Sequence, residues 1–285
     1  MDEAALQGWI GREAVAEDEA SPVLLRRLAA LLDQDPGAIR RGAPMPEGWH
    51  VVLFGPLARQ SALGPDGHPE KGDFLPPVPL PRRMFAGRRT WFVAPVEIGA
   101  EVRRVSRIAA ITQKQGRSGA MVFVTIRHGI ESGGRECVVE EQDLVFREAA
   151  PAGPSGAAPP EAPPPALPEE AAREVFTPDP VLLFRYSAVT NNGHRIHYDA
   201  AYATGTEGYP ALVVNGGIAT TKLTELAKRH LPGRLRSVTT RAGRPLFLGR
   251  PVTLAYHAEA PGRARLWALD EAGRLAFECL AEGAA

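Results

Sequence analysis

Two stretches of this 285-residue chain decide the fold: PVEIGAEV at residues 95–102 and PLFLGRPV at residues 245–252. Each reads proline, three residues, glycine, two residues and valine, and each leads into a run with strand-like alternation. Further along, Gly134 and Gly273 each precede an arginine and another strand-like run. A short pattern that recurs in the same order indicates two copies of one structural unit.

Each copy combines a helical stretch with a strand-rich stretch. Ser21 and Pro22 open a run of leucines at helical spacing, and residues 213–230 contain a second helix, which we expect to begin after Asn215. The strands that we expect are residues 49–54, 89–94, 101–111, 120–128, 136–146, 236–241, 251–259, 264–269 and 275–281. This order predicts an α+β protein with antiparallel sheets.

A proline-rich segment at residues 151–168 lies between the copies. Eight of its residues are proline, and almost all of the others are alanine or glycine. Such a segment cannot form a helix interior or a central strand. We therefore predict an N-terminal domain at residues 1–150, a linker at residues 151–168 and a C-terminal domain at residues 169–285.

The composition excludes several classes of protein. Lys and Arg together number 33, and so do Asp and Glu, so the net charge of zero argues against binding to nucleic acid or to an anionic membrane. The N-terminus does not resemble a secretory signal and no window reads as a membrane span, so we predict a cytoplasmic protein. Cys137 and Cys279 lie in apolar runs and are expected to be buried thiols.

Chemistry-bearing residues gather in FRYSAVTNNGHRIHYD at residues 184–199. His194 and His197 are three residues apart and share one face if the segment is helical. The first interpretation is a general acid or base, because histidine changes charge near neutral pH. The second is a zinc pair, but no third ligand is recognisable nearby, and we predict no metal. The third is a polar surface turn.

The stretch TNNGHRIH at residues 190–197 resembles the motif of the MaoC-like hydratases and dehydratases, which act on acyl thioesters and have the hotdog fold. In this resemblance His197 matches the catalytic histidine. Asn192 stands where many members have the catalytic aspartate, and an amide can orient a water molecule but cannot accept its proton.

A narrower branch, the two-domain mesaconyl-C4-CoA (3-methylfumaryl-CoA) hydratases, is similar to nearly the whole chain and has asparagine at the position of Asn192. These hydratases are relatives of the type 2 hydroxyacyl-thioester dehydratases. The similarity includes EGYPALVVNGG at residues 207–217, WIGR at residues 9–12 and LPRRMFAG at residues 80–87. It implies a double hotdog fold, in which each domain is a long helix wrapped by an antiparallel sheet. It also implies one working site, built mainly from the second domain.

The chain departs from the family at Asn215, Gly216 and Gly217, where relatives usually have His-Gly-Pro. In a hotdog fold this turn begins the central helix, whose unpaired N–H groups can stabilise an oxyanion on a thioester. The two glycines would let a ligand approach the backbone closely. An ordinary asparagine N-cap is equally compatible with the turn.

The resemblance implies reversible addition of water to an enoyl-CoA, with mesaconyl-C4-CoA as substrate and a citramalyl-CoA product. His197 would be the base, Asn192 would position the water, and Arg195 would bind substrate. Coenzyme A is part of the substrate, and no other cofactor is implied. The other arginines that could bind phosphates or a carboxylate are Arg82, Arg83, Arg88, Arg89, Arg241 and Arg244.

Three alternatives stay open. The first is a dehydratase that acts on hydroxyacyl thioesters of coenzyme A or of an acyl carrier protein. The second is a hotdog thioesterase, which would need a carboxylate such as Glu225 near the thioester, although a solvated helix face is the plainer interpretation of that residue. The third is a non-catalytic acyl-CoA-binding protein. Further association of the fused pair into a homodimer is also left open.

Overall fold

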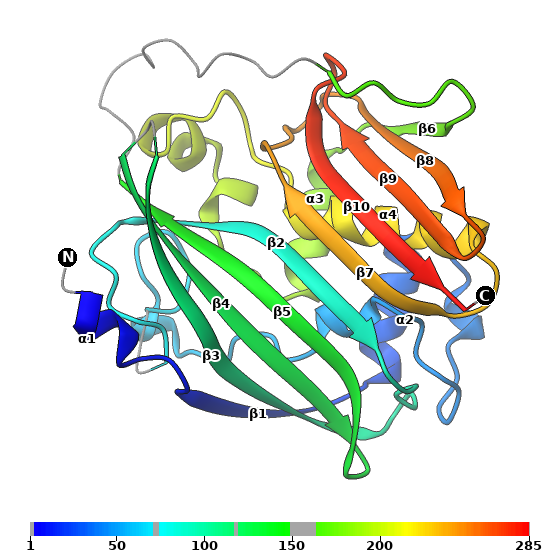
Figure 1. The fold of residues 1–285 in the computed structure, drawn as a ribbon, viewed down its shortest axis with the longest axis horizontal. Coiled ribbons are helices and arrows are strands. Elements are labelled where there is room, and N and C mark those ends of the chain that lie inside the picture. Colours follow the sequence, from blue (N-terminus) through cyan, green and yellow to red (C-terminus); the bar gives the residue numbers. More distant parts are fainter. Residues whose placement is uncertain (1–2, 71–73, 117–118, 149–163, 285) are drawn as a thin grey trace.

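In the computed structural model, ten strands form one antiparallel sheet, and the main helices lie on one of its faces (Figure 1). The structure describes residues 3–70, 74–116, 119–148 and 164–284. The strands of the first half are β1 (Glu13–Glu19), β2 (Arg82–Phe92), β3 (Glu101–Gly116), β4 (Gly119–Ser132) and β5 (Arg135–Arg147). Those of the second half are β6 (Ala172–Phe176), β7 (Leu235–Ala242), β8 (Val252–Ala260), β9 (Arg263–Leu269) and β10 (Leu275–Gly283).

The strand order shows that the two halves repeat one topology. The order is β1-β3-β4-β5-β2 in the first half, and β6-β8-β9-β10-β7 in the second half when read from its outer edge. The halves meet where β2 pairs with β7, so the sheet continues from one half to the other. A side chain at Gly87 on β2 would meet the carbonyl oxygen of Thr240 on β7 at 2.8 Å, so this junction requires a glycine. The predicted repeat is present.

The recurring sequence pattern is a recurring turn. Gly99 and Gly249 both have left-handed φ angles, of 90° and 76°, which favour glycine. The N–H of Gly99 donates to the carbonyl of Ala20 at 2.8 Å, and the N–H of Gly249 donates to that of Pro178 at 2.9 Å. In both halves the turn before a long strand therefore bonds to the segment that directly follows the edge strand of the same half.

The two halves differ in their helices. The helices are α1 (Glu3–Gln7), α2 (Pro22–Leu31), α3 (Pro180–Val189) and α4 (Gly216–His230), with short helical turns η1 (Pro36–Ala38), η2 (Trp49–Val52), η3 (Gln60–Ala62), η4 (Arg195–His197) and η5 (Tyr202–Thr206). The β-bridge that precedes α4, Val213 with Phe247, has a counterpart in Pro44 with Glu97, which precedes η2. The short turn η2 therefore stands in the first half where the 15-residue helix α4 stands in the second.

The expected strand at residues 49–54 is wrong. Gly48 has a left-handed φ of 87°, which turns the chain so that the fully buried Trp49 enters the core from a helical turn. The sequence did not predict β1, β6 or α3. Strand β1 is acidic and lies at the sheet edge, where Glu13 and Glu17 stand opposite Arg107 and Arg103 of β3. An edge strand of this kind has no apolar alternation to reveal it.

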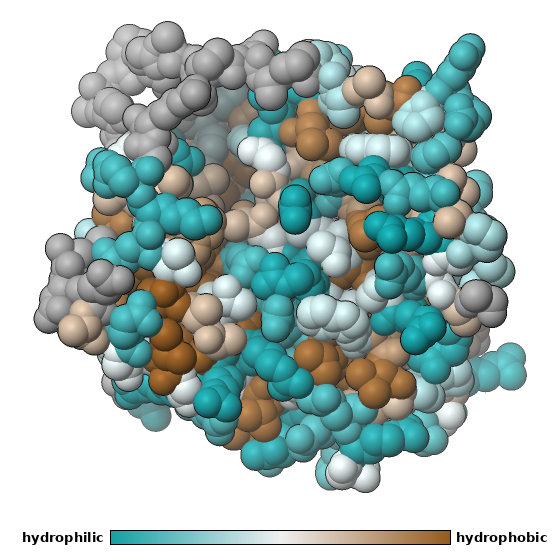
Figure 2. Space-filling view, in the orientation of Figure 1, coloured by the Kyte–Doolittle hydropathy of each residue, from teal (hydrophilic) through white to brown (hydrophobic). Residues whose placement is uncertain are grey.

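The main core lies between the sheet and the helices. It includes Leu25 and Leu28 of α2, Ile218 and Leu223 of α4, and both cysteine thiols, which are buried as predicted. On the face shown in Figure 2, hydrophilic residues cover much of the surface, with hydrophobic residues in small groups between them. No helix of the described ranges is long and apolar enough to cross a membrane. Residues 151–163 of the predicted linker lie outside the described residues.

Candidate active site

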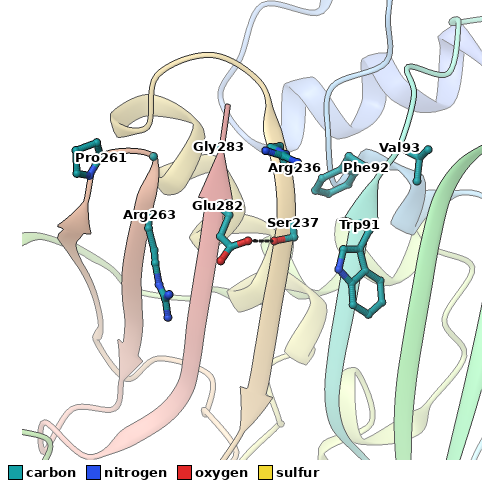
Figure 3. Close-up of a pocket in the computed structure, with 10 residues that line it drawn as sticks. Trp91, Phe92, Val93, Arg236, Ser237, Pro261, Arg263, Glu282 and Gly283 are labelled. Atoms are coloured by element: carbon teal, nitrogen blue, oxygen red, sulfur yellow. Dashed lines mark hydrogen bonds between the residues drawn. The ribbon is translucent and has the colours of Figure 1, made fainter. Parts of the chain in front are cut away.

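A pocket of about 540 Å³ on the sheet is not the site of the predicted chemistry (Figure 3). Trp91, Ser237, Glu282 and Arg263 form one row across β2, β7, β10 and β9. Their chain neighbours, such as the buried Val238, point to the helix-covered core. The pocket therefore opens on the outer face of the sheet, and no residue of the 184–199 motif lines it.

His197 is a buried histidine whose tautomer is determined by one backbone contact. It ends η4, and its Nδ1 lies 2.7 Å from the carbonyl oxygen of Val213. A carbonyl can only accept, so Nδ1 carries the hydrogen and Nε2 presents a lone pair. Burial lowers the pKa of His197 to about 4, although the bond to Val213 opposes this shift. His197 is therefore a neutral base at pH 7.

The same carbonyl brings His197 to the N-terminus of α4. Asn215 follows Val213 by two residues and is the N-cap of α4, where its Oδ1 accepts from the N–H of Gly217 at 2.9 Å. The Nδ2 of Asn215 is buried without a hydrogen-bond partner in the described structure. Asn215 is thus both an N-cap and a donor available to a ligand, in addition to the positive end of the helix dipole.

The two glycines of this turn make room for the protein's own aromatic side chains, and close approach of a ligand to the backbone at Gly216 and Gly217 stays a prediction. A Cβ at Gly217 would collide with the hydroxyl of Tyr186, and one at Gly216 would meet the ring of Phe277 at 3.2 Å. Tyr186 is almost fully buried on α3. The protein's own aromatic side chains therefore explain both glycines.

Asn192 has its acceptor occupied. Its Oδ1 accepts from the backbone N–H of His194 at 2.9 Å, which closes a local turn before η4. Only the NH₂ of the side chain remains to donate. The NH₂ group can therefore donate to the oxygen of a bound water. The amide cannot accept a proton from that water.

A loop of the first half covers the motif. The side-chain Nδ2 of Asn191 donates to the carbonyl of Pro56 at 2.7 Å, and the backbone N–H of Arg195 donates to that of Asp66 at 2.9 Å. Gly67 lies so close to Gly193 that a Cβ on Gly67 would collide with the Gly193 carbonyl. The motif is therefore held in place by backbone contacts from both halves.

Arg195 holds this loop in place, and its predicted role in binding substrate stays a prediction. Its Nη2 and Nε donate to Asp199 at 2.7 and 3.1 Å, and its Nη1 donates to the carbonyl of Pro65 at 2.9 Å. The guanidinium also lies 4.1 Å from the ring centroid of Tyr202. These contacts use three of the five N–H donors and one face of the guanidinium.

Asp66 and His68 lie beside the motif, although no pattern in the sequence predicts them there. The ring of His68 lies 4.2 Å from that of His194, which in turn lies 5.4 Å from that of His197, centroid to centroid. Burial lowers the pKa of His194 to about 3, with further contributions from His68 and His197. Burial acts to raise the pKa of Asp66, but hydrogen bonds from His68 hold it well below its usual range.

Asp66, His68 and His194 form a group that could hold a metal ion, and sequence spacing does not reveal it. Ligand atoms of Asp66, His68 and His194 all lie within 4.8 Å of one another. Asp66 and His68 already bond to each other at 2.9 Å. His194 therefore has two further possible ligands beside it, but His197 is not part of this group, and the absence of a metal stays a prediction. In the sequence, Asp66-Gly67-His68 looks only like a turn.

Several of the arginines singled out from the sequence contact side chains outside the 184–199 motif. Arg89 pairs with Glu141 and Asp143, Arg244 pairs with Asp270, and Arg82 contacts Tyr209 and Glu207. Arg241 is exposed. Arg83 and Arg88 instead line a pocket on the concave side of the first half.

Glu225 is buried, which corrects its interpretation as part of a solvated helix face. Its carboxylate accepts from Trp49 Nε1 at 2.8 Å, Gln34 Nε2 at 2.7 Å and Lys228 Nζ at 2.6 Å. Trp49 and Gln34 belong to the first half. Glu225 therefore joins the two halves.

With this geometry in view, comparison with known proteins assigns the family. Residues 48–248 match the family described as hydroxyacyl-thioester dehydratase type 2. The chain is 44% identical over 249 residues to a mesaconyl-C(4)-CoA hydratase of Chloroflexus aurantiacus, with 87% of each protein covered. The chain belongs to the type 2 hydroxyacyl-thioester dehydratase family.

Solved structures confirm the fold. A MaoC-like dehydratase from Phytophthora capsici superposes with a TM-score of 0.74 at 14% identity, covering 100% of this chain and 98% of that one. A Mycobacterium tuberculosis protein described as a double hotdog fold superposes with a TM-score of 0.56 at 14% identity, covering 95% of each chain. The predicted double hotdog is confirmed, with the difference that the first half has only η2 in place of a long central helix.

Proposed function

We propose that this protein is a hydro-lyase that adds water reversibly across the double bond of mesaconyl-C4-CoA and forms citramalyl-CoA. One observation supports the proposal most directly. The carbonyl of Val213 orients His197 so that Nε2 is the base, and Val213 lies two residues before Asn215, the N-cap of α4. A base and an oxyanion-stabilising helix end are the two groups that hydration of an enoyl thioester requires. Membership of the dehydratase family and the similarity to the hydratase of Chloroflexus support it.

The mechanism follows from these groups. The thioester oxygen accepts from donors at the start of α4, including Nδ2 of Asn215. The NH₂ of Asn192 holds the water, and Nε2 of His197 takes one of its protons while the oxygen bonds to the β-carbon. Electrons of the double bond move toward the thioester, and the negative charge on its oxygen is stabilised by the helix end. The proton then passes from His197 to the α-carbon, so that one water is added in total.

The reverse direction makes the dehydratase the natural second candidate, because the same groups catalyse both directions. The thioesterase alternative loses its carboxylate, since Glu225 is held by three donors. It also lies nine residues from Gly216, or roughly 13 Å along the helix axis. Action on acyl carrier protein, a homodimer and a cytoplasmic location stay predictions.

The test is to mix the purified protein with mesaconyl-C4-CoA and follow the absorbance of the conjugated enoyl thioester. We expect the absorbance to fall, the product mass to increase by one water and no free thiol to appear. Release of free coenzyme A would instead identify a thioesterase. Binding of the thioester without any turnover would identify a binding protein.

A further inference from the structure

A row of polar residues crosses the concave face of the first half, where an apolar core is expected. Ser106, His128, Glu140 and Thr90 stand opposite one another on β3, β4, β5 and β2, and all four are buried. His128 Nδ1 lies 2.8 Å from Ser106 Oγ, and Glu140 Oε2 lies 2.9 Å from Nε2 of His50 on η2. Burying such a row costs free energy, and it therefore points to a binding role.

Three guanidinium groups surround this row in a pocket of about 470 Å³. Arg88 pairs with Glu140 at 3.2 Å, and Arg104 lies 4.7 Å from the ring centroid of Phe54, with its Nε buried and without a hydrogen-bond partner in the described structure. Burial lowers the pKa values of Arg83 and Arg104. Since η2 replaces a long helix here, side chains of the sheet line the space that α4 fills in the second half.

The lining of this pocket has more guanidinium groups than buried carboxylates. Glu140 is the buried carboxylate among the lining residues. Burial acts to raise its pKa, but Arg88 and His50 hold the pKa well below its usual range. Glu70 also lines the pocket but is exposed. Burial lowers the pKa of His128 to about 4, so this residue is neutral at pH 7. Asp66 and Asp18, which do not line the pocket, also act electrostatically on Arg83 and Arg104. Arg88 pairs directly with Glu140, whereas Nε of Arg104 is buried without a hydrogen-bond partner in the described structure and is left to donate to an anionic ligand.

The pocket borders the loop that covers the motif, because Pro56 and Pro69 line it and the Pro56 carbonyl accepts from Nδ2 of Asn191. Arg83 lies close enough to His194 and Asp66 to shift pKa values electrostatically, and Arg88 does the same to Tyr186. Tyr186 in turn lies against Gly217 in the first turn of α4. A substrate carboxylate in this pocket would therefore lie on the first-half side of the motif, next to the loop that covers it. The phosphates of coenzyme A are kept far from the reacting carbons by the pantetheine arm.

We propose that Arg83, Arg88 and Arg104 bind the free carboxylate of a dicarboxylic acyl chain, so that the first half selects the substrate. This inference rests on the proposed function and names the group that its site recognises. A guanidinium matches a carboxylate through two parallel N–H donors. In mesaconyl-C4-CoA this carboxylate is attached to the β-carbon. Binding it would fix the face that the water attacks and offset a negative charge that opposes the developing enolate.

The experiment compares two substrates that share coenzyme A and differ in the carboxylate. Wild type, Arg83→Met and Arg104→Met are assayed with mesaconyl-C4-CoA and with crotonyl-CoA, which has no free carboxylate. We expect the ratio of kcat/KM for mesaconyl-C4-CoA to that for crotonyl-CoA to fall about 100-fold in each variant, as for loss of a buried charge pair. The matched control is Arg103→Met. Arg103 is exposed, neighbours Arg104 and pairs with Glu131, so the kcat/KM ratio of this variant should equal that of wild type.

Thermal unfolding of each variant shows whether it is folded, and two arginines are tested so that a fold defect in one leaves the other informative. An equal loss for both substrates in folded variants would assign the arginines to the coenzyme A phosphates and overturn the proposal. An unchanged ratio would also overturn it. If wild type hydrates neither substrate, the proposed function itself fails; if it hydrates both without dependence on the arginines, only this inference fails.

Discussion

At the residue scale, the environment of His197 makes it a base. The carbonyl of Val213 fixes its tautomer, and burial keeps the imidazole neutral. The sequence motif predicted His197, but it could not predict the tautomer, because the partner is a backbone atom 16 residues away. Nor could it predict that Asn192 and Arg195 would be engaged by their own loop, since those contacts depend on how the chain turns.

The pKa of His197 predicts the acid limb of the activity. Since the protonated imidazole cannot accept a proton, activity is present above the pKa of His197 and is lost as the pH falls through that pKa, at about 4. We therefore expect kcat/KM for enoyl-CoA hydration to stay level from pH 8 down to about pH 5. The measurement is a profile of kcat/KM against pH.

To distinguish protonation from acid unfolding, samples kept at low pH are returned to pH 7.5 and assayed. Full recovery of activity shows that the protein was not irreversibly unfolded. A half-maximal rate near the ordinary histidine pKa of about 6.5 would show that His197 is not desolvated in the working enzyme.

At the element scale, the start of α4 depends on the contact between Gly217 and Tyr186. Gly217→Ala would push a methyl group into the Tyr186 hydroxyl and ring, and we expect the free energy of unfolding to fall by about 1–3 kcal/mol. Urea denaturation measures this change. Tyr186→Phe removes the hydroxyl, so the double variant should lose less than the sum of the two single variants. Additive losses would show that the two positions do not touch.

Elements with strong periodicity could be predicted from the sequence, and those that tertiary contacts form could not. Strands β7 to β10 and helices α2 and α4 lie close to where apolar alternation or helical spacing places them. Helix α3 was missed because its apolar residues surround most of the helix and leave no amphipathic pattern. The sequence predicts a strand in place of η2 because residues 49–54 are largely apolar. The left-handed conformation of Gly48, which directs this segment toward the core, cannot be inferred from that pattern.

At the scale of the whole molecule, the two halves are held together by a shared sheet, a covering loop and the carboxylate of Glu225. The repeat in the sequence predicted two similar halves. It could not show that a loop of the first half would place Asp66 and His68 beside His194, because those contacts join distant parts of the chain.

Glu225 gives a prediction at this scale. Glu225→Gln removes the charge that accepts from Trp49, Gln34 and Lys228, and we expect the free energy of unfolding to fall by about 1–3 kcal/mol. The exposed Glu282→Gln is the matched control and should change it by less than about 0.5 kcal/mol in the same urea titration. Equal effects of the two substitutions would show that Glu225 does not join the halves.

If His197 is the base of an enoyl-CoA hydration, removing its imidazole should remove most of the activity. The most direct test is the rate of mesaconyl-C4-CoA hydration by wild type and by His197→Ala, with His257→Ala as a histidine control on β8. Loss of a general base predicts a fall in kcat of about 100-fold or more for His197→Ala in a folded protein, and wild-type rates for the control. Equal rates of hydration by His197→Ala and wild type would show that His197 is not the base.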